Sequence, residues 1–288
     1  MRLLSFHADG QDRYGAVRDH GVIDLSARLA TRAPTLKALI ENGDLARAAA
    51  IAGNNSPDFA LADLEFHPPI PTPGKIICIG VNYGDRNAEY RDDSAAPKYP
   101  SVFMRTAESL VGHGQPIMRP PESDQLDYEG EIVLIIGKAG RRIAREAAWS
   151  HIAGLSLMNE GSVRDWLRHA KFNVTQGKNF ERSGSWGPWI QTPEELPLTT
   201  TLHLTTQVNG ELRQDDTTAN LIFPFDYLIS YLSSFMPLKP GDIIASGTPT
   251  GAGARFDPPK YLRDGDVVTV SVPEIGVLEN RIEDEFAR

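Results

Sequence analysis

Short apolar runs bounded by glycine, aspartate or proline predict β-strands along most of the chain. Near the N-terminus such runs cover residues 2–6, 14–18 and 21–25. Leucine, isoleucine and alanine then recur at helical spacing between Leu36 and Ala49, until a glycine and two asparagines end the pattern. This part of the chain predicts a small unit of three strands followed by a helical segment.

Strand patterns are denser after residue 74, and helical patterns are few. The pair Asn209-Gly210 between two strand-like runs is typical of a tight type I′ hairpin. Many short strands joined by frequent turns favour a β-rich sandwich or roll with peripheral helices over a doubly wound sheet. The predicted strands cover residues 75–81, 132–136, 202–208, 242–245 and 267–272, and the predicted helices cover 84–92, 143–152 and 225–236.

A proline-rich segment separates the two regions. Residues 67–74 contain four prolines, which cannot donate hydrogen bonds to a sheet and which stiffen the backbone. We interpret the segment as a linker between a small N-terminal α+β domain, residues 1–70, and a larger main domain, residues 71–288. The expected fold class is therefore α+β and rich in strands.

Composition and charge narrow the function classes. The 288 residues include 29 lysines and arginines against 38 aspartates and glutamates, a formal net charge of −9. This acidic balance excludes the basic face that nucleic acid or an anionic membrane surface requires. No apolar run approaches the roughly 18 residues of a membrane span, and no secretion signal is recognisable, so we expect a cytoplasmic protein. The one cysteine, Cys78, excludes an intrachain disulfide and a cysteine-based zinc site.

The first candidate chemistry lies in the segment Asp-Tyr-Glu-Gly-Glu at residues 127–131. Alternation along a strand places Glu129 and Glu131 on one face, directly before the apolar residues 132–136. Two carboxylates near a core repel one another unless a proton or a cation lies between them. Hard cations such as Mg²⁺, Mn²⁺ and Ca²⁺ prefer carboxylate oxygens, so the pair predicts a divalent metal site. The exposed face of an edge strand is the alternative interpretation.

Three further segments place polar residues beside glycines. Glu160 follows the apolar run 152–158 and precedes a glycine, and Lys178 lies in the segment Gly-Lys-Asn-Phe. Residues 246–253 form a glycine-rich turn without the Gly-Lys-Ser/Thr ending of a phosphate loop. Each segment alone is typical of a turn or a helix cap.

Together the motifs resemble the fumarylacetoacetate hydrolase family in its compact bacterial form. The order runs from Val-Asn-Tyr through Asp-Tyr-Glu-Gly-Glu, Asn-Glu-Gly-Ser-Val-Arg-Asp and Gly-Lys-Asn-Phe to Ser-Gly-Thr-Pro-Thr-Gly, within residues 73–284. The resemblance implies a mixed β-sandwich roll, a homodimer and one divalent ion, Mg²⁺ or Mn²⁺, per active site. It also implies small-molecule substrates that are 2-oxo acids, usually 2,4-dioxo acids or their enols. The apolar residues 221–225 and the pair Phe235-Met236 also favour a dimer.

The resemblance assigns roles to single residues. By this match Glu129, Glu131 and Glu160 bind the metal, although Glu160 stands where the family normally has an aspartate. The longer side chain can still reach a metal, but it changes the geometry at that corner of the site.

Four further residues receive substrate-binding or catalytic roles from the same match. Arg164 corresponds to an arginine that contacts the substrate or the developing oxyanion. Lys178 corresponds to a lysine that holds a substrate oxygen near the metal. Thr248 corresponds to a threonine that binds the substrate carboxylate, and Tyr83 of Val-Asn-Tyr is assigned to substrate binding.

One departure from the family pattern concerns water activation. Glu89 is retained, but Arg86 stands where hydrolytic and decarboxylating relatives have a histidine, and arginine cannot act as a base. Arg86 is then a surface partner of Glu89 or a ligand for a distal substrate carboxylate. Glu89 alone activates water, or His113 or His169 substitutes for the missing histidine. The polar segment 84–96 is expected to be a lid that is mobile until substrate binds.

Three function classes follow. The first is a metal-dependent hydrolase that cleaves a C–C bond of a 2,4-dioxo acid, such as an acylpyruvate or a fumarylpyruvate-like acid. The second uses the same metal site without water attack, as a tautomerase, isomerase, decarboxylase or hydratase of an enolisable 2-oxo acid such as oxaloacetate. The third is a non-enzymatic binding protein, which would not explain why the motifs occur in the same order as in the family.

Overall fold

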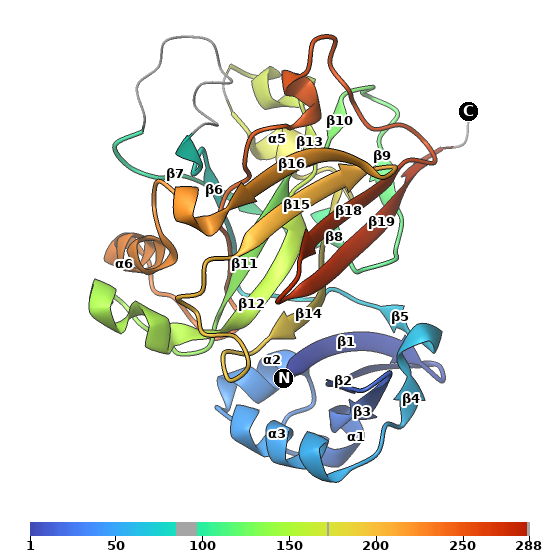
Figure 1. Ribbon diagram of the computed structural model, residues 1–288, viewed down its shortest axis with the longest axis vertical. Helices are drawn as coiled ribbons and strands as arrows, with labels where there is room; N and C mark the ends of the chain where they lie inside the picture. Colours follow the sequence, from blue (N-terminus) through green and yellow to red (C-terminus); the bar gives the residue numbers. More distant parts are fainter. Residues whose placement is uncertain (85–96, 172, 287–288) are drawn as a thin grey trace.

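The computed structural model describes residues 1–84, 97–171 and 173–286, and Figure 1 shows how their elements are arranged. Most strands among these residues belong to one long mixed sheet with the order β4-β3-β2-β1-β14-β12-β11-β17-β6-β7, in which β5 also pairs with β1 and β8 with β14. Its twelve strands are β1 (Arg2–Ala8), β2 (Gln11–Arg18), β3 (Gly21–Asp24), β4 (Phe59–Ala60), β5 (Glu65–Phe66), β6 (Ile76–Gly80), β7 (Ser101–Arg105), β8 (Leu110–Val111), β11 (Gly130–Ile136), β12 (Ile152–Asn159), β14 (Gly184–Gln191) and β17 (Ile243–Ala245).

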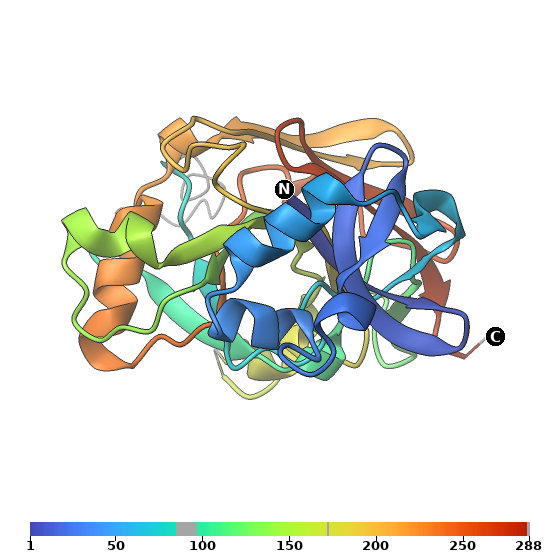
Figure 2. The ribbon, with the colours of Figure 1, turned by 90° about the horizontal axis from the view of Figure 1, so that it is seen from below.

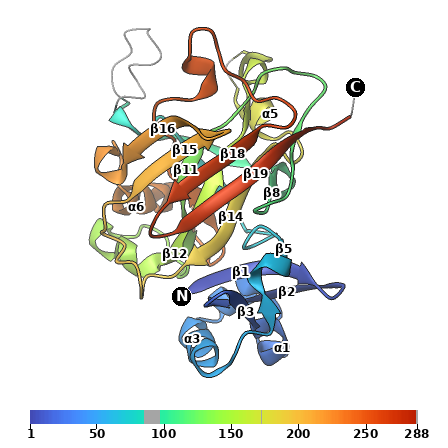
Figure 3. The same ribbon diagram turned by 45° about the vertical axis from the view of Figure 1, so that its right-hand side comes forward.

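A second sheet covers one face of the central strands (Figure 3). Its strands follow the order β16-β15-β18-β19-β9, and β10 and β13 form a separate two-stranded pair. The bounds are β9 (Ile117–Arg119), β10 (Leu126–Asp127), β13 (Ser162–Val163), β15 (His203–Val208), β16 (Glu211–Thr217), β18 (Val267–Val272) and β19 (Gly276–Asp284).

Helices lie at the periphery, as the sequence predicts. The three N-terminal helices lie beside the first strands at one end of the molecule, which Figure 2 shows from below. The described α-helices are α1 (Leu25–Leu29), α2 (Leu36–Glu41), α3 (Leu45–Asn54), α5 (Thr175–Lys178) and α6 (Phe225–Phe235). Short 3₁₀ helices cover Leu61–Asp63, Ala107–Ser109, Arg145–His151, Asp165–Arg168, Thr218–Asn220 and Gly253–Arg255. No described helix combines the length and the apolar character that a membrane span needs.

Strand β11 is buried on both faces, which explains its unbroken apolar run. Ile132 and Leu134 pack in one apolar cluster with the second sheet and α6. Val133 and Ile135 pack in another cluster that contains residues of the N-terminal helices. Because neither face meets water, the strand holds the residues at its start in a fixed position.

The N-terminal strands continue directly into the central sheet. β1 pairs with β14, with Arg2 opposite Gln191, and the apolar cluster around Val133 also contains Leu36 and Leu39. The proline-rich residues 67–74 form no helix or strand. The domain boundary near residue 70 stays a prediction.

The strand-rich α+β fold class is confirmed, and each predicted strand has a counterpart. The helical pattern from Leu36 is interrupted at Gly43, whose φ of 68° ends α2 before α3 begins. Within the segment 143–152, Arg145–His151 forms a 3₁₀ helix rather than an α-helix, and β12 starts directly after that helix at Ile152. The Asn209-Gly210 hairpin is present, with φ of 52° and 78°. The helix predicted over 84–92 lies almost entirely outside the described residues.

Candidate active site

Three glutamates lie together where two central strands meet. Glu129 directly precedes β11, Glu131 is the second residue of β11, and Glu160 directly follows β12. The two strands are antiparallel, with Gly130 opposite Asn159, so the start of one lies beside the end of the other. Carboxylate oxygens of the three glutamates lie within 4.8 Å of one another, and all three side chains are buried.

Local backbone contacts fix this arrangement. The N–H of Glu160 donates to the carbonyl of Glu129 at 2.7 Å, and Asn159 Oδ1 accepts from the N–H of Glu129 at 3.0 Å. A side chain at Gly130 would overlap Thr206 Oγ1 of the second sheet, so glycine is required there. The bare face of the glycine leaves the flanking glutamates on the opposite face, as strand alternation predicts.

Buried cations contact these carboxylates. Lys178 Nζ, at the end of α5, lies 2.6 Å from Glu129 Oε2 and 3.2 Å from Glu160 Oε2. Arg105 Nη1 lies 3.5 Å from Glu160 Oε1. The Phe103 ring, centred 5.2 Å from Lys178 Nζ, covers the ammonium group with an aromatic face.

Arg164 connects the site to a fourth acid, Asp127. Its guanidinium donates from Nε to Asp127 Oδ2 and from Nη2 to Glu129 Oε1, both at 2.7 Å. The Asp127 carboxylate also accepts from the backbone N–H groups of Gly253 at 2.8 Å and Ala254 at 2.9 Å. Asp127 is fully buried, so this network holds the guanidinium in one orientation.

The electrostatics of the site disfavour ionisation of all three glutamates in the absence of a bound cation. Burial, together with the charges of Glu160 and Glu129, raises the pKa of Glu131 well above its usual range. Burial alone would lower the pKa of Lys178, but the carboxylates of Glu129 and Glu160 outweigh it and raise the pKa. Lys178 is therefore a cation at neutral pH, and Glu131 resists ionisation until another positive charge is nearby.

The donor set fits a hard divalent cation. All three candidate ligands are carboxylates, which suit Mg²⁺ and Mn²⁺, and the three belong to rigid strand ends. Glu160 Oε1 is buried and accepts no hydrogen bond from the described residues, and its ion pair with Arg105 Nη1 is long, at 3.5 Å. A bound cation would satisfy that oxygen and remove the repulsion that raises the pKa of Glu131.

A cavity of about 250 Å³ opens onto the three glutamates. Its volume suits a small organic acid. Cationic, apolar and hydroxyl groups surround the acids, so a charged ligand would meet fixed partners. The lining residues include Ile79, Phe103, Leu167, Val174, Arg164, Arg168, Lys178, Thr248 and Arg255, together with the three glutamates.

Thr248 reaches the cavity from the turn after β17. Its Oγ1 accepts a hydrogen bond from Gln214 Nε2 at 2.8 Å, and Gln214 Oε1 accepts from the N–H of Gly130 at 2.9 Å. Gln214 thus ties the threonine to the strand that carries two of the glutamates. This contact leaves the Thr248 hydroxyl hydrogen available to donate toward the cavity.

Some residues predicted from the sequence to belong to the site do not line the cavity, and others are not among the described residues. Tyr83 is fully buried and does not line the cavity, where Gly80 and Val81 form the nearby wall, so its role stays a prediction. Arg86, Glu89 and the rest of the predicted lid at 85–96 lie outside the described residues.

Neither histidine considered as a substitute base lines the cavity. His113 packs against Phe66 and accepts from the N–H of Glu279, and His169 stacks on Trp166. The site thus brings together Glu129, Glu131, Glu160, Arg164, Lys178 and Thr248.

Sequence reasoning missed several polar residues around the site, and two of them, Arg168 and Arg255, line the cavity. Asp127 has a usable signal, because it belongs to the same short segment as Glu129. Gln214 also has a signal, because it ends the segment Val-Asn-Gly-Glu-Leu-Arg-Gln at 208–214, which belongs to the same order of family motifs. Arg105 has none, because β7 reaches the site only through long-range pairing.

Comparison with known proteins places this site in a family. The family described as fumarylacetoacetate (FAA) hydrolase C-terminal matches residues 75–283. The chain belongs to the fumarylacetoacetate hydrolase family. The N-terminal residues before the match, which pair with the central sheet through β1, lie outside that family description.

Three relatives show the range of activities among similar proteins. Oxaloacetate tautomerase YisK of Bacillus subtilis is 40% identical over 227 residues, which cover 78% of this chain and 75% of that protein. The structure of a fumarylacetoacetate hydrolase from Exiguobacterium antarcticum has a TM-score of 0.83 at 31% identity, covering 99% of this chain and 100% of that one. A maleylpyruvate hydrolase from Sphingobium sp. SYK-6, in complex with manganese(II) and pyruvate, has a TM-score of 0.79 at 27% identity and 99% coverage of both chains.

Proposed function

We propose that this protein is a divalent-metal-dependent tautomerase of a small dicarboxylic 2-oxo acid of the oxaloacetate type. The observation that carries the proposal is the cavity in which Glu129, Glu131 and Glu160 face a set of arginines and a lysine. The 40% identical Bacillus subtilis relative, an oxaloacetate tautomerase, supports the same reaction. The proton-transfer reaction removes a hydrogen from C3, forms the C2–C3 double bond and places a proton on the C2 oxygen.

The charges around the cavity suit a substrate with two carboxylates. Among the described residues, three glutamates line the cavity together with the cationic side chains of Arg164, Arg168, Lys178 and Arg255. A bound divalent ion adds two positive charges, whereas Asp127 behind Arg164 adds one negative charge. Several cationic groups therefore surround the space left for a ligand, which favours an anion with two carboxylates.

The residues of the chain have separate tasks in this proposal. When bound to the three glutamates, a divalent ion supplies a Lewis acid beside the 2-oxo group. Lys178 donates a hydrogen bond to the oxygen on which enolate charge develops, and Thr248 holds the adjacent carboxylate. Arg164, oriented by Asp127, adds a second donor. The predicted proton acceptor is Glu89, outside the described residues.

A C–C hydrolase of a 2,4-dioxo acid is the second candidate. The similarity to a maleylpyruvate hydrolase that binds manganese(II) and pyruvate favours it. The enolate that forms in tautomerisation is also the leaving group of C–C cleavage, so one site can support both reactions. Water activation then requires a base, and none of the described residues lining the cavity is a histidine.

The test is an assay of the Mn²⁺-loaded protein on two substrate classes. Enol-to-keto conversion of oxaloacetate is followed by loss of enol absorbance, and acylpyruvate cleavage by pyruvate release. We expect conversion of oxaloacetate well above the buffer rate and little pyruvate. Rapid cleavage of an acylpyruvate without acceleration of the oxaloacetate reaction would favour the hydrolase instead.

The assembly belongs to the same proposal. We propose a homodimer, in which the exposed Phe235, with 51% of its surface accessible, is a candidate contact. Phe223 and Phe225, by contrast, are buried within the chain and leave no apolar surface for a partner. Light scattering checks the mass against the 31.6 kDa monomer.

A further inference from the structure

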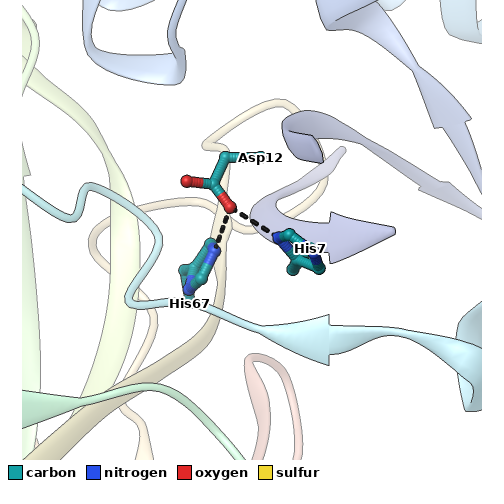
Figure 4. A group of neighbouring side chains, drawn as sticks. All are labelled: His7, Asp12 and His67. Atoms are coloured by element: carbon teal, nitrogen blue, oxygen red, sulfur yellow. Dashed lines mark hydrogen bonds and ion pairs between the residues drawn. The ribbon is translucent and has the colours of Figure 1, made fainter. Parts of the chain in front are cut away.

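Two histidines and an aspartate converge on the N-terminal strands, outside the candidate active site (Figure 4). His7 Nδ1 lies 2.8 Å from Asp12 Oδ1, and His67 Nε2 lies 2.9 Å from the same oxygen. Figure 4 shows both imidazole rings directed at this one carboxylate. The proposed reaction uses none of the three residues.

The backbone fixes the three side chains beside one another. His7 on β1 stands directly opposite Asp12 on β2, in a hairpin whose turn residues Asp9 and Gly10 have φ of 50° and 72°. β5 pairs with the other edge of β1, and directly after it the N–H of His67 donates to Ser5 C=O at 3.0 Å. The site is therefore assembled from segments 55 residues apart by the sheet itself.

We propose that His7, Asp12 and His67 bind a divalent transition-metal ion of the zinc class. Two imidazole nitrogens and one carboxylate oxygen form a borderline donor set that suits Zn²⁺, Co²⁺ and Ni²⁺ better than Mg²⁺. Three protein ligands leave at least one position for water.

The two contacts to Asp12 need only a small adjustment to accept the ion. One ligand atom from each residue lies within 4.8 Å of the others. Bonds of about 2.1 Å in a tetrahedron separate ligand atoms by about 3.4 Å, so the two short contacts to Asp12 must open by about half an ångström. The Asp12 side chain has 76% of its surface exposed and is free to make that movement.

The charges and the access also favour a cation. Asp12 Oδ1 lies within 2.9 Å of both imidazoles, so a carboxylate oxygen stands between the two nitrogen ligands. The neighbouring Arg13 does not neutralise it, because its guanidinium contacts Asp24 at 2.6 Å. A cavity of about 150 Å³ reaches Asp12 and His67 from solvent.

Binding exchanges hydrogen bonds for coordinate bonds and changes no oxidation state. Each imidazole gives up the proton on the nitrogen that faces Asp12, either to its other ring nitrogen or, if the ring is charged, to solvent. The ion then connects the β1–β2 hairpin to the start of the proline-rich segment 67–74. Because these segments separate when the chain unfolds, the ion stabilises the native state.

The experiment is a zinc titration of chelator-stripped protein by calorimetry. Because the three-glutamate site also has the chemistry to take Zn²⁺, the titration uses Glu131→Gln as background, in which that site lacks a ligand. We expect one equivalent of Zn²⁺ to bind in this background. Adding His7→Gln or His67→Gln should weaken the binding at least about 100-fold, because losing a direct ligand costs more affinity than losing a residue that only hydrogen-bonds to a ligand. His20→Gln, on an exposed turn of the same N-terminal region, is the matched control and should leave both the amount of bound Zn²⁺ and its affinity unchanged.

Two measurements distinguish loss of Zn²⁺ binding from loss of the fold and from loss of catalytic activity. Zn²⁺ should raise the melting temperature of Glu131→Gln but not of the variant that also carries His67→Gln, while the circular dichroism of both stays native. In the otherwise unsubstituted chain, His67→Gln should leave the Mn²⁺-supported activity unchanged, whatever the substrate proves to be. Equal Zn²⁺ affinity with and without His7 and His67 would overturn the proposal.

Discussion

Lys178 Nζ donates a hydrogen bond to Glu129 Oε2 at 2.6 Å, and both side chains are buried. The pair places a permanent cation at the edge of the predicted metal site, where it faces the cavity. A charge already oriented at this position costs no reorganisation when negative charge develops on a bound 2-oxo acid.

Lys178→Met tests that role. The change removes the donor to the developing enolate oxygen, so kcat should fall by about 10²–10³-fold, the usual effect of losing one such donor. Initial rates on oxaloacetate measure it. Lys138→Met removes an exposed lysine at the far end of β11 and serves as the matched control, with activity within about twofold of wild type. A small effect of Lys178→Met on kcat would exclude the lysine from catalysis.

Glu131→Gln separates metal binding from stability. Without metal, the raised pKa of Glu131 means that the folded state binds its proton more tightly than the unfolded state does. Stability of the stripped wild type therefore falls as pH rises from the ordinary glutamate pKa of 4.5 to the raised value. The glutamine has no charge to bury, so the stripped variant should be more stable than the stripped wild type at neutral pH, by about 1–3 kcal/mol.

With Mn²⁺ the order should reverse, because only the wild type retains the full set of ligands and gains binding free energy. Urea unfolding with and without Mn²⁺ measures both effects. Glu283→Gln, on the exposed side of β19, should show neither of them. An unchanged Mn²⁺ affinity in Glu131→Gln would remove this residue from the ligand set.

Asp127→Asn tests whether Asp127, which does not line the cavity, acts by positioning Arg164. The carboxylate orients Arg164 through a 2.7 Å contact, and the asparagine can keep the shape but not the charge. We expect kcat/KM to fall by about 10–100-fold, or roughly 1.4–2.8 kcal/mol, with Mn²⁺ affinity nearly unchanged. If the variant lost native structure, measured by circular dichroism, to the same extent as it lost activity, Asp127 would have only a structural role.

Arg255→Met tests the assignment of a dianionic substrate. Removing one cation from the cavity wall should raise KM for a dicarboxylic 2-oxo acid by about tenfold or more. A monocarboxylic 2-oxo acid should show little change, because it has no distal carboxylate. Arg281→Met, with an exposed arginine on β19, is the control. An equal loss on both substrates would show that Arg255 contacts the shared part of the molecule.

Local sequence signals predicted the parts of the site that lie on one strand. Alternation around Gly130 placed Glu129 and Glu131 together, and the apolar run after them marked a strand buried on both faces. Glu160 required the motif order as well, because only the pairing of β11 with β12 brings it near.

The remainder depends on contacts that no local pattern encodes. Arg105 reaches Glu160 from β7, and Gln214 reaches Thr248 from β16, each through sheet pairing across long stretches of chain. The same limit applies to the N-terminal strands. The prolines at 67–74 predict a linker, whereas the pairing of β1 with β14 makes one continuous sheet.

The most direct measurement of the central claim is the activity of chelator-stripped protein on oxaloacetate while Mn²⁺ is added, with bound metal counted in the same samples. The three buried glutamates predict that activity is absent without metal and returns in proportion to one tightly bound ion per chain. Full tautomerase activity in the stripped protein would contradict the metal-dependent site.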